Sequence, residues 1–365
     1  MNREELYTSA LNLLQELIKI PSLSREENGT ATLLEHFLSE QNIEHFRVGN
    51  NVYALSKGYD PSKPTLFLNS HHDTVMPSPA YTQNPFEPIT TNEKLFGLGS
   101  NDAGVSLVCL IHTFLYFQSK PLHCNLIIAA TAEEEISGKG GLELLLKDEA
   151  FLQKIGGKES YQNFTGIVGE PTKMQMAIAE RGLMVLDCEA TGKTGHAARE
   201  EGENAVYIAL DDIHILRNSL LDKNSDLLGM SKITATHIST ENTQHNVVPA
   251  SCKFLLDVRL NEHYTHEQAL DLIRSNLRSA CIPRSMRIRS SIIPIHHPLV
   301  QAGTALGLQH YGSPTTSDKA LMPFPALKMG PGDSARSHMA DEFIFLTDID
   351  DGIEGYINII TKTYA

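Results

Sequence analysis

Apolar strand-like runs alternate with helical segments through the first half of the chain. Residues 65–69, 125–131 and 166–169 are short apolar runs, and helical patterns occupy the stretch up to Pro21, the stretch around Leu33–Leu38, and residues 105–117. Strands that are apolar throughout are buried on both faces, as in a parallel or mixed sheet covered by helices. The sequence therefore predicts an α/β fold with a mostly parallel or mixed sheet flanked by helices.

The pattern changes at about residue 178. A strand at 183–190 is followed by a helix at 204–218, strands at 233–238 and 253–259, a helix at 266–280 and a strand at 286–293. This β-α-β-β-α-β order is typical of a split-βαβ, ferredoxin-like domain. Because 365 residues exceed what one core usually supports, we expect an α+β domain at 178–286 inserted into a catalytic domain at 1–177 and 287–365. A strand at 326–329 and a helix at 349–361 would return to the first sheet.

Charge and cysteine content exclude several classes of protein. The 44 acidic and 30 basic residues give a net charge of -14, which argues against nucleic acid or an anionic membrane as a partner. The five cysteines are far apart and contain no Cys-x-x-Cys pair, so neither a disulfide framework nor a thiolate zinc site is expected. Charged residues interrupt the amphipathic N-terminal segment, which fits neither a signal peptide nor a membrane span. We expect a cytoplasmic location.

Acidic and histidine residues follow the predicted strands, where open α/β sheets place their sites. They stand in five short segments, which hold His71 with His72 and Asp73, Asp102, the triplet Glu133–Glu135, Glu170, and His338. Each segment alone has an ordinary interpretation, such as a solvated acidic loop, a surface His-Asp pair or a plain turn. Their occurrence together, each after a strand, favours a shared site.

A metal centre explains this set of residues. Several buried like charges are costly unless a cation compensates them. Two imidazoles and three carboxylates without thiolate suit zinc or a similar divalent ion, and one bridging carboxylate would let five ligands serve two ions. In the His-x-Asp pair, Asp73 can orient the imidazole of His71.

The segments SHHDTV, LGSNDAG, TAEEEISG, VGEPT and GPGDSARSH resemble, in order and spacing, those of a family of dinuclear zinc aminoacylases and exopeptidases. This family includes acetylornithine deacetylase, succinyl-diaminopimelate desuccinylase and carboxypeptidases that release C-terminal glutamate. The resemblance spans essentially the whole chain and implies a zinc-exopeptidase-like fold that binds two Zn²⁺, with Co²⁺ or Mn²⁺ as substitutes.

The same resemblance implies roles for individual residues. His71 and Glu170 would bind one ion, Glu135 and His338 the other, and Asp102 both. Asp73 would hold His71, and Glu134 would be the general base. Glu133 is expected to be structural or solvated.

In the inserted lid domain, the segment TGKTGHAA resembles the family stretch whose histidine reaches a neighbouring active site. His196 would then stabilise the oxyanion across a homodimer formed through the lid. Asn246 and Arg259 match a substrate-binding stretch, and Arg259 would pair with a substrate carboxylate. Further substrate contacts are expected from Thr316, Ser317 and Gly332. The ordinary alternatives are a loop histidine and a surface arginine.

The chain departs from the family pattern at several positions. Asp102 is followed by Ala103-Gly104 where the family has Met-Lys, so a lysine beside the bridging carboxylate is missing. Glu133 stands where an aspartate is usual. Ala179-Glu180-Arg181-Gly182 replaces the Arg-Arg-Gly of desuccinylases, and Glu180 is expected to disfavour a doubly anionic substrate and to attract a cationic amine.

Within the resemblance, the sequence predicts a metal-dependent amidohydrolase that removes the acyl group from acetylornithine in arginine biosynthesis. The alternatives are the same chemistry on succinylornithine, acetylcitrulline or succinyl-diaminopimelate, and a metallo-exopeptidase. A catalytically silent metabolite-binding relative is the alternative outside enzymes. The retained Glu134 argues against it, because a binding protein needs no base.

Overall fold

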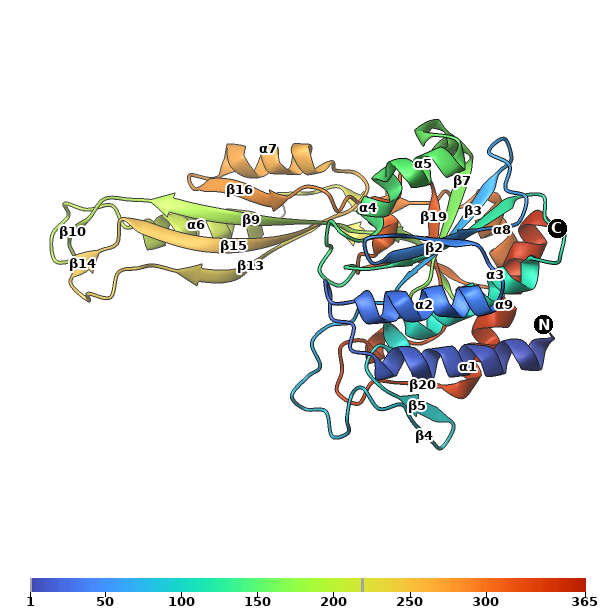
Figure 1. Ribbon diagram of the computed structural model, residues 1–365. Coiled ribbons are helices and arrows are strands. Elements are labelled where there is room, and N and C mark those ends of the chain that lie inside the picture. The colour runs from blue at the N-terminus through green and yellow to red at the C-terminus, as the bar shows by residue number, and fades with distance from the viewer. Residues whose placement is uncertain (1, 218–219) are drawn as a thin grey trace. The chain divides into compact units, whose positions relative to one another are not determined.

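The computed structural model describes residues 2–217 and 220–365, which form two compact units (Figure 1). The first contains residues 2–178, Ile293–Tyr311 and Ser317–Ala365. The second contains Ala179–Ile292, apart from 218–219, and Gly312–Thr316. The second unit thus extends past the expected boundary at 286 and takes in a later segment that includes Thr316.

A mixed sheet forms the centre of the first unit, as predicted. Its strands lie in the order β1 (His45–Val48), β2 (Asn51–Leu55), β6 (Asn125–Thr131), β3 (Thr65–His71), β7 (Phe164–Val168), β19 (Ala326–Lys328) and β8 (Met176–Glu180). β3 runs parallel to β6 and β7, and β19 runs parallel to β7. The pairs β1–β2, β2–β6 and β19–β8 are antiparallel.

Helices cover both faces of this sheet (Figure 1). One face carries α1 (Arg3–Lys19), α2 (Asn28–Glu40), α3 (Val105–Phe117) and α9 (Leu346–Tyr364), and α8 (Pro298–Ala305) packs on α9. α3 has the bounds predicted for it and is buried along nearly its whole length, because it lies between the sheet and helices α1 and α9. On the opposite face, α4 (Leu142–Lys147) and α5 (Glu149–Ile155) pack on an aromatic cluster that includes Tyr53, Phe67 and Phe151.

α1 begins with a capping box, in which Asn2 and Glu5 satisfy each other's main-chain N–H groups. Its buried face consists of apolar residues at helical spacing, Leu6, Ala10, Leu13, Leu14, Leu17 and Ile18. Across residues 2–217 and 220–365, the helices are all too short or too polar to cross a bilayer.

Short elements link the sheet to the loops at its edge. β20 (Phe343–Phe345), β5 (Lys94–Phe96) and β4 (Ile89–Thr91) form a small antiparallel sheet, in which the Lys94 ammonium lies 3.9 Å from the centre of the Phe343 ring. The helical turns are η1 (Ser100–Gly104), η2 (Lys158–Asn163), η3 (Asp318–Leu321) and η4 (Ser334–Arg336), and β18 (His310–Ser313) follows α8. The small sheet fixes the segment before α9 against the start of η1.

The second unit has the predicted β-α-β-β-α-β order. Its antiparallel sheet has the order β13 (Lys232–Ser239), β15 (Ser251–Leu260), β9 (Gly182–Thr191) and β16 (Ala280–Ser285). α6 (Ala205–Arg217) and α7 (His266–Asn276) share one apolar core with this sheet. Short pairs are formed by β10 (Gly195–His196) with β14 (Val247–Val248) and by β11 (Asn224–Ser225) with β12 (Gly229–Met230).

The end of this unit differs from the prediction. α7 ends at Asn276 rather than at 280, and the last strand is β16, at Ala280–Ser285, rather than 286–293, where the structure has only β17 (Ser291–Ile292). β16 contains Pro283, which has no N–H to donate, and it lies at the sheet edge, where this loss is tolerated. The predicted helix 204–218 ends at Arg217, and residue 218 lies outside the described part of the chain.

Candidate metal centre

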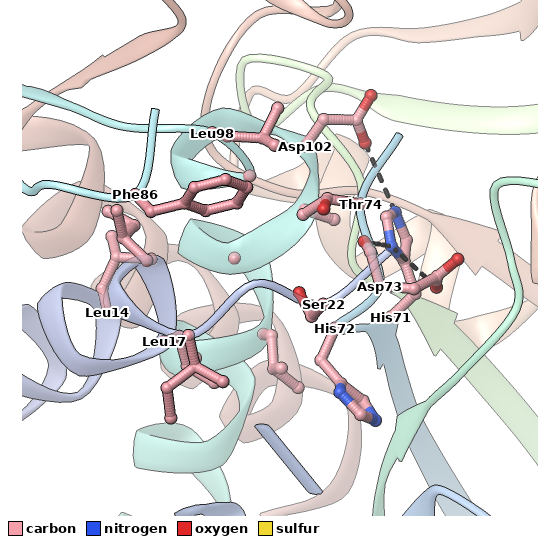
Figure 2. A pocket seen from close by; sticks show the side chains of 16 residues that line it. Leu14, Leu17, Ser22, His71, His72, Asp73, Thr74, Phe86, Leu98 and Asp102 are labelled. Atoms are coloured by element: carbon pink, nitrogen blue, oxygen red, sulfur yellow. Dashed lines mark hydrogen bonds and ion pairs between the residues drawn. The ribbon is translucent and has the colours of Figure 1, made fainter. Parts of the chain in front are cut away.

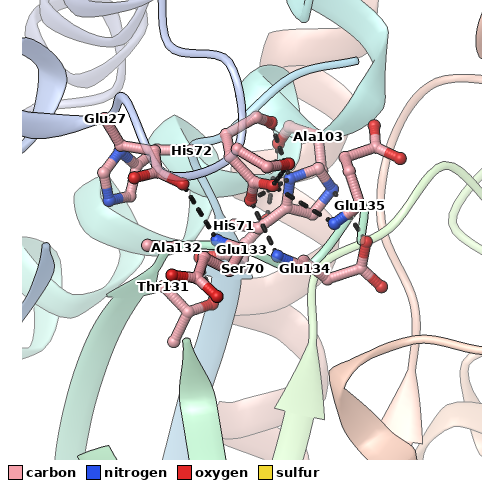
Figure 3. A network of polar contacts seen from close by, with 12 residues as sticks. Glu27, Ser70, His71, His72, Ala103, Thr131, Ala132, Glu133, Glu134 and Glu135 are labelled. Carbon is pink, nitrogen blue, oxygen red and sulfur yellow. Dashed lines mark hydrogen bonds and ion pairs between the residues drawn. The ribbon is translucent and has the colours of Figure 1, made fainter. Parts of the chain in front are cut away.

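The parallel strands β6, β3 and β7 bring three of the predicted segments to one sheet edge. Figure 3 shows two of them, with His71 beside Glu133–Glu135. β3 ends at His71, β6 is followed by Glu133–Glu135, and β7 is followed by Glu170. The C-terminal ends of parallel strands meet at the same edge, which is where α/β sheets hold their sites. Asp102 comes from η1, and His338 comes from the loop after η4.

The imidazole of His71 is buried and faces three carboxylates. Its Nε2 atom lies 3.4 Å from Asp102 Oδ1, 3.8 Å from Glu170 Oε1 and 4.0 Å from Glu134 Oε2. Its Nδ1 atom donates to the main-chain oxygen of Asp73 at 2.9 Å, so in the neutral ring Nε2 is a lone-pair donor. Ligands of a tetrahedral zinc at bond lengths of 2.0–2.1 Å lie roughly 3.3 Å apart, so these separations fit a shared cation.

A second group lies on the other side of Asp102. His338 Nε2 is 3.0 Å from Glu135 Oε2 and 3.7 Å from Asp102 Oδ2. The two oxygens of Asp102 therefore face different imidazoles, Oδ1 towards His71 and Oδ2 towards His338. This is the arrangement that a carboxylate shared between two ions requires.

The ligand atoms of these residues are close enough to share ions. Those of His71, Glu134 and Glu170 lie within 4.8 Å of one another, as do those of His71, Asp102 and Glu135. Both groups contain oxygen and nitrogen donors only, which suits a borderline divalent cation.

The electrostatics of the cluster also call for positive charge. Burial raises the pKa of Glu134 well above its usual range, and the nearby charge of Glu170 raises it further. Burial opposes the charged form of His71, but the carboxylates of Asp102 and Asp73 raise its pKa well above the ordinary value. The hydrogen bond to Glu135 raises the pKa of His338 to about 9. Neighbouring carboxylates contribute to all three shifts, and divalent cations would compensate their negative charge.

The carboxylate of Asp73 contacts the acidic loop more closely than it contacts His71. It accepts hydrogen bonds from the main-chain N–H groups of Glu134 at 3.0 Å and Glu135 at 3.2 Å, and from Ser24 Oγ at 2.6 Å. Its distance to His71 Nδ1 is 3.4 Å. Asp73 therefore orients His71 mainly through its own main-chain carbonyl, while its side chain shapes the loop that carries Glu134 and Glu135.

A small cavity lies beside His71 on the side facing α1 (Figure 2). Leu14, Leu17, Phe86 and Leu98 line it together with Thr74, and its volume is about 20 Å³. This is room for about one water molecule, so an acyl amino acid cannot bind there.

Glu342 is a buried acid at the site that the sequence analysis missed. Its side chain is 2% exposed and accepts hydrogen bonds from the N–H groups of Gly99, Asn101 and Asp102. Burial, and then the charge of Asp102, raise its pKa to about 8, although the three N–H groups act in the opposite direction. In the sequence it is an acid before a short strand, which is typical of a solvated residue.

Two further buried acids support the strand ends and were also missed. Asp318 accepts a hydrogen bond from Thr131 Oγ1 at 2.7 Å, and burial raises its pKa to about 6. Glu27 accepts from Glu133 N at 3.2 Å and from Asn50 Nδ2 at 2.8 Å, and Figure 3 shows it beside the acidic loop. Glu133 itself accepts from Gly140 N at 3.1 Å. Glu133 thus has the structural environment expected of it.

Two of the expected substrate contacts lie in the first unit. Ser317 is buried, and its hydroxyl accepts from Lys319 N at the start of η3. Gly332 has a φ of +82°, and a Cβ there would lie 2.6 Å from Asn101 Oδ1. That oxygen accepts from Asp333 N at 2.9 Å, so the close approach explains the glycine.

The other expected contacts belong to the second unit, which brings two of them together. Ala197 N donates to the main-chain oxygen of Asn246 at 2.9 Å, and the adjacent exposed His196 pairs with Val247. His196 Nδ1 accepts from Ala198 N at 3.1 Å, so the neutral ring carries its proton on Nε2.

Arg259 lies in the long strand β15, away from the β10–β14 pair. Its guanidinium forms a bidentate pair with Asp257 at 2.8 and 3.0 Å, on the same face of that strand. The structure thus shows an arginine that already has a carboxylate partner.

Glu180 does not fit the role expected of it. Attraction of a cationic substrate requires an accessible carboxylate, but Glu180 is fully buried at the end of β8. Arg181, next to it, donates to the main-chain oxygen of Leu228. A buried carboxylate cannot meet a substrate amine at the surface, so this argument for a cationic substrate fails.

Comparison with known proteins identifies the family. The model of Peptidase family M20/M25/M40 matches residues 67–362. The chain belongs to this family. The expected metal-dependent hydrolase family is thereby confirmed.

Two curated relatives are succinyl-diaminopimelate desuccinylases. The one from Ruegeria sp. is 27% identical over 74% of this chain and 70% of its own length. The one from Paracoccus denitrificans is 28% identical over 77% and 74%. A solved structure, aminopeptidase PepT from Bacillus cereus, covers 100% of this chain and 99% of its own with a TM-score of 0.76 and 17% identity, which shows a shared fold. The names of the two curated relatives match one of the alternative substrates, succinyl-diaminopimelate, rather than the acetylornithine predicted first.

Proposed function

We propose that this M20 protein is a dinuclear metal-dependent amidohydrolase that removes an acyl group from the nitrogen of an amino acid. The observation that carries the proposal is the position of Asp102 between His71 and His338, with Glu134 beside them. Two imidazoles, a shared carboxylate and a buried acid provide ligands for two ions and a base for water.

Each ion would have its own ligands. His71 and Glu170 would bind one, Glu135 and His338 the other, and Asp102 both. Zinc suits this donor set, with Co²⁺ or Mn²⁺ as substitutes. When bound, the two ions would polarise the amide carbonyl and lower the pKa of water.

Glu134 is proposed as the general base. Its burial raises its pKa, so it binds a proton more readily than an exposed carboxylate does. It would take a proton from the attacking water and deliver it to the leaving amine nitrogen. Asp73 holds the main chain of the same loop, so it would fix the position of Glu134 during both transfers.

The proposed substrates are N-succinyl amino acids, with succinyl-diaminopimelate as the first candidate. Both curated relatives described above are named succinyl-diaminopimelate desuccinylases. Acetylornithine is the second candidate. Glu180 replaces the first arginine of the desuccinylase Arg-Arg-Gly segment, and Arg181 is engaged with Leu228. A substrate without the succinyl carboxylate would have no need of that missing arginine.

A homodimer through the second unit is part of the proposal. β13 is an edge strand whose side chains are mostly exposed, and α6 exposes Tyr207 (66%) and Leu210 (50%). An unpaired edge and exposed apolar side chains are typical of a surface that a second copy covers. His196, with its proton on Nε2, would then donate to the oxyanion in the partner's site.

Asn246, Thr316, Ser317 and Gly332 remain proposed substrate contacts. Arg259 could join them only by leaving Asp257. The cytoplasmic location remains a prediction.

The test is amine release from succinyl-diaminopimelate, succinylornithine, acetylornithine and acetylcitrulline, with and without a chelator. Chelator-sensitive hydrolysis of any of them supports the amidohydrolase, and the preferred substrate decides between the two candidates. If none is hydrolysed by protein shown to hold two ions, dipeptides come next. Failure there as well would favour a binding protein.

A further inference from the structure

We propose that Glu342 is a positioning residue that holds Asp102 in the orientation needed to bind two ions. The inference rests on the proposed dinuclear centre, and it concerns an acid outside the ligand set. Glu342 acts through the main chain of the turn at Gly99–Asp102.

The contacts of Glu342 are all made to that turn. Its Oε2 accepts from Gly99 N at 2.9 Å, and its Oε1 accepts from Asn101 N and Asp102 N, both at 2.8 Å. Both oxygens are thus engaged by N–H donors of one short segment. The two oxygens of Glu342 can accept from all three donors, whereas the NH2 group of a glutamine can accept from none of them.

The turn in question ends at the shared ligand. The N–H of Asp102 is bonded to Glu342, and the carboxylate of the same residue divides its two oxygens between His71 and His338. A displacement of the Asp102 main chain by a fraction of an ångström would alter both distances. Glu342 therefore fixes the residue that both ions would share. The ion that binds more weakly, here called the second, should respond first to the loss of this support.

Glu342 is itself fixed from the other side. Its main-chain oxygen accepts from Gly97 N at 3.0 Å, and the next residue, Phe343, begins β20 and pairs with Phe96 of β5. The acid is thus held by a sheet that does not include the metal ligands. This anchoring makes it a rigid support for the turn.

The neighbouring residue offers a matched control. Asp341 also accepts three hydrogen bonds, from Thr82 N at 2.9 Å, Thr82 Oγ1 at 2.7 Å and Gln83 N at 3.4 Å. These contacts fix a different loop and do not reach Asp102. Removing either acid deletes three hydrogen bonds made by the same segment, but only those of Glu342 hold the turn at Gly99–Asp102.

The experiment is metal titration of the metal-free full-length protein with Co²⁺, followed by calorimetry and by the visible spectrum of bound cobalt. We expect the wild type to bind two ions, and Glu342→Ala to keep the first while binding the second about 10- to 100-fold more weakly. Glu342→Gln retains one acceptor oxygen and should be intermediate. Asp341→Ala should bind both ions as the wild type does.

The outcomes separate the two proposals. If the wild type itself fails to bind two ions, the dinuclear centre is wrong. If the wild type binds two and Glu342→Ala binds both with wild-type affinity and an unchanged spectrum, the positioning role is wrong, even where the melting temperature falls. If Glu342→Ala does not fold, Glu342→Gln decides: wild-type binding of both ions by that variant overturns the role, and weaker binding of the second ion supports it.

Discussion

The metal-centre edge of the first unit and the β10–β14 end of the second unit hold their candidate residues in opposite ways. His71, Asp73 and Glu342 are buried and hydrogen-bonded to main-chain groups of neighbouring loops. His196 is exposed and lies on a two-residue strand, and its side chain accepts a hydrogen bond from Ala198 N of its own loop. The candidate residues of the first unit are preorganised by these hydrogen bonds. The role of those in the second unit depends on the substrate or the second copy of the chain that they would contact.

The largest effect is expected at the first of these regions. Glu134→Gln keeps the size of the side chain but removes the base, so kcat should fall by about a thousandfold or more. Metal content should remain at the wild-type level, because Glu134 is not a proposed ligand. The measurement is steady-state kinetics on the best substrate together with elemental analysis. Loss of an ion in this variant would instead make Glu134 a ligand, which the grouping with His71 and Glu170 allows.

The exposed histidine of the second unit should give the next largest effect. His196→Ala should lower kcat by about a hundredfold with little change in stability, as expected for loss of one oxyanion donor. Mixed with Glu134→Ala subunits, it should recover activity at about a quarter of the sites, because half of randomly paired dimers then contain one intact site. Absence of recovery after verified subunit exchange would show that His196 does not act across a dimer.

Buried and exposed histidines should also differ in their effect on stability. Nδ1 of His112 in α3 donates to Val108 O at 2.7 Å, so Nε2 of the neutral ring accepts from Ser9 Oγ at 2.9 Å. Burial lowers the pKa of His112 to about 4 despite the Val108 bond. Between pH 6.5 and 4 the unfolded chain therefore binds a proton that the folded protein does not. The free energy of unfolding should fall by about 3 kcal/mol over this range on account of His112 alone.

Denaturant unfolding at pH 8, 6 and 4.5 of the metal-free wild type and His112→Phe tests this. The variant loses two hydrogen bonds and should be less stable at pH 8, but its stability should decline less steeply towards pH 4.5. Equal slopes for the two proteins would contradict the assignment. Comparison at matched pH removes the contribution of the metal-site carboxylates.

Particular residues show what the sequence could and could not predict. The segments with His71, Glu133–Glu135 and Glu170 were predictable because the parallel strands that precede them end at one edge. The helix at 105–117 was predictable because its sequence is almost wholly apolar. Glu342 could not be predicted, since hydrogen bonds to the main chain of residues some 240 positions away leave no local pattern. The last strand of the second unit was misplaced because it includes a proline, which only its edge position tolerates. The residues next to Glu180 in the sequence do not indicate that its carboxylate is buried either.

The smallest effect is expected from the pair formed by Asp257 and Arg259, and it bears directly on the second unit. The two residues are two positions apart in β15, and alternation in a strand places them on the same face, so the pair could have been predicted. Both side chains are about one third exposed, and an ion pair of this kind contributes roughly 0–1 kcal/mol. Asp257→Asn should therefore change stability little, and it frees the guanidinium of Arg259.

The KM for an anionic substrate tests the role of Arg259. If Arg259 binds a substrate carboxylate, the KM of Asp257→Asn should fall severalfold while kcat is unchanged, whereas Arg259→Gln should raise KM. An unchanged KM in both variants would leave Arg259 as a residue of the sheet and place substrate recognition on Asn246 and the first unit.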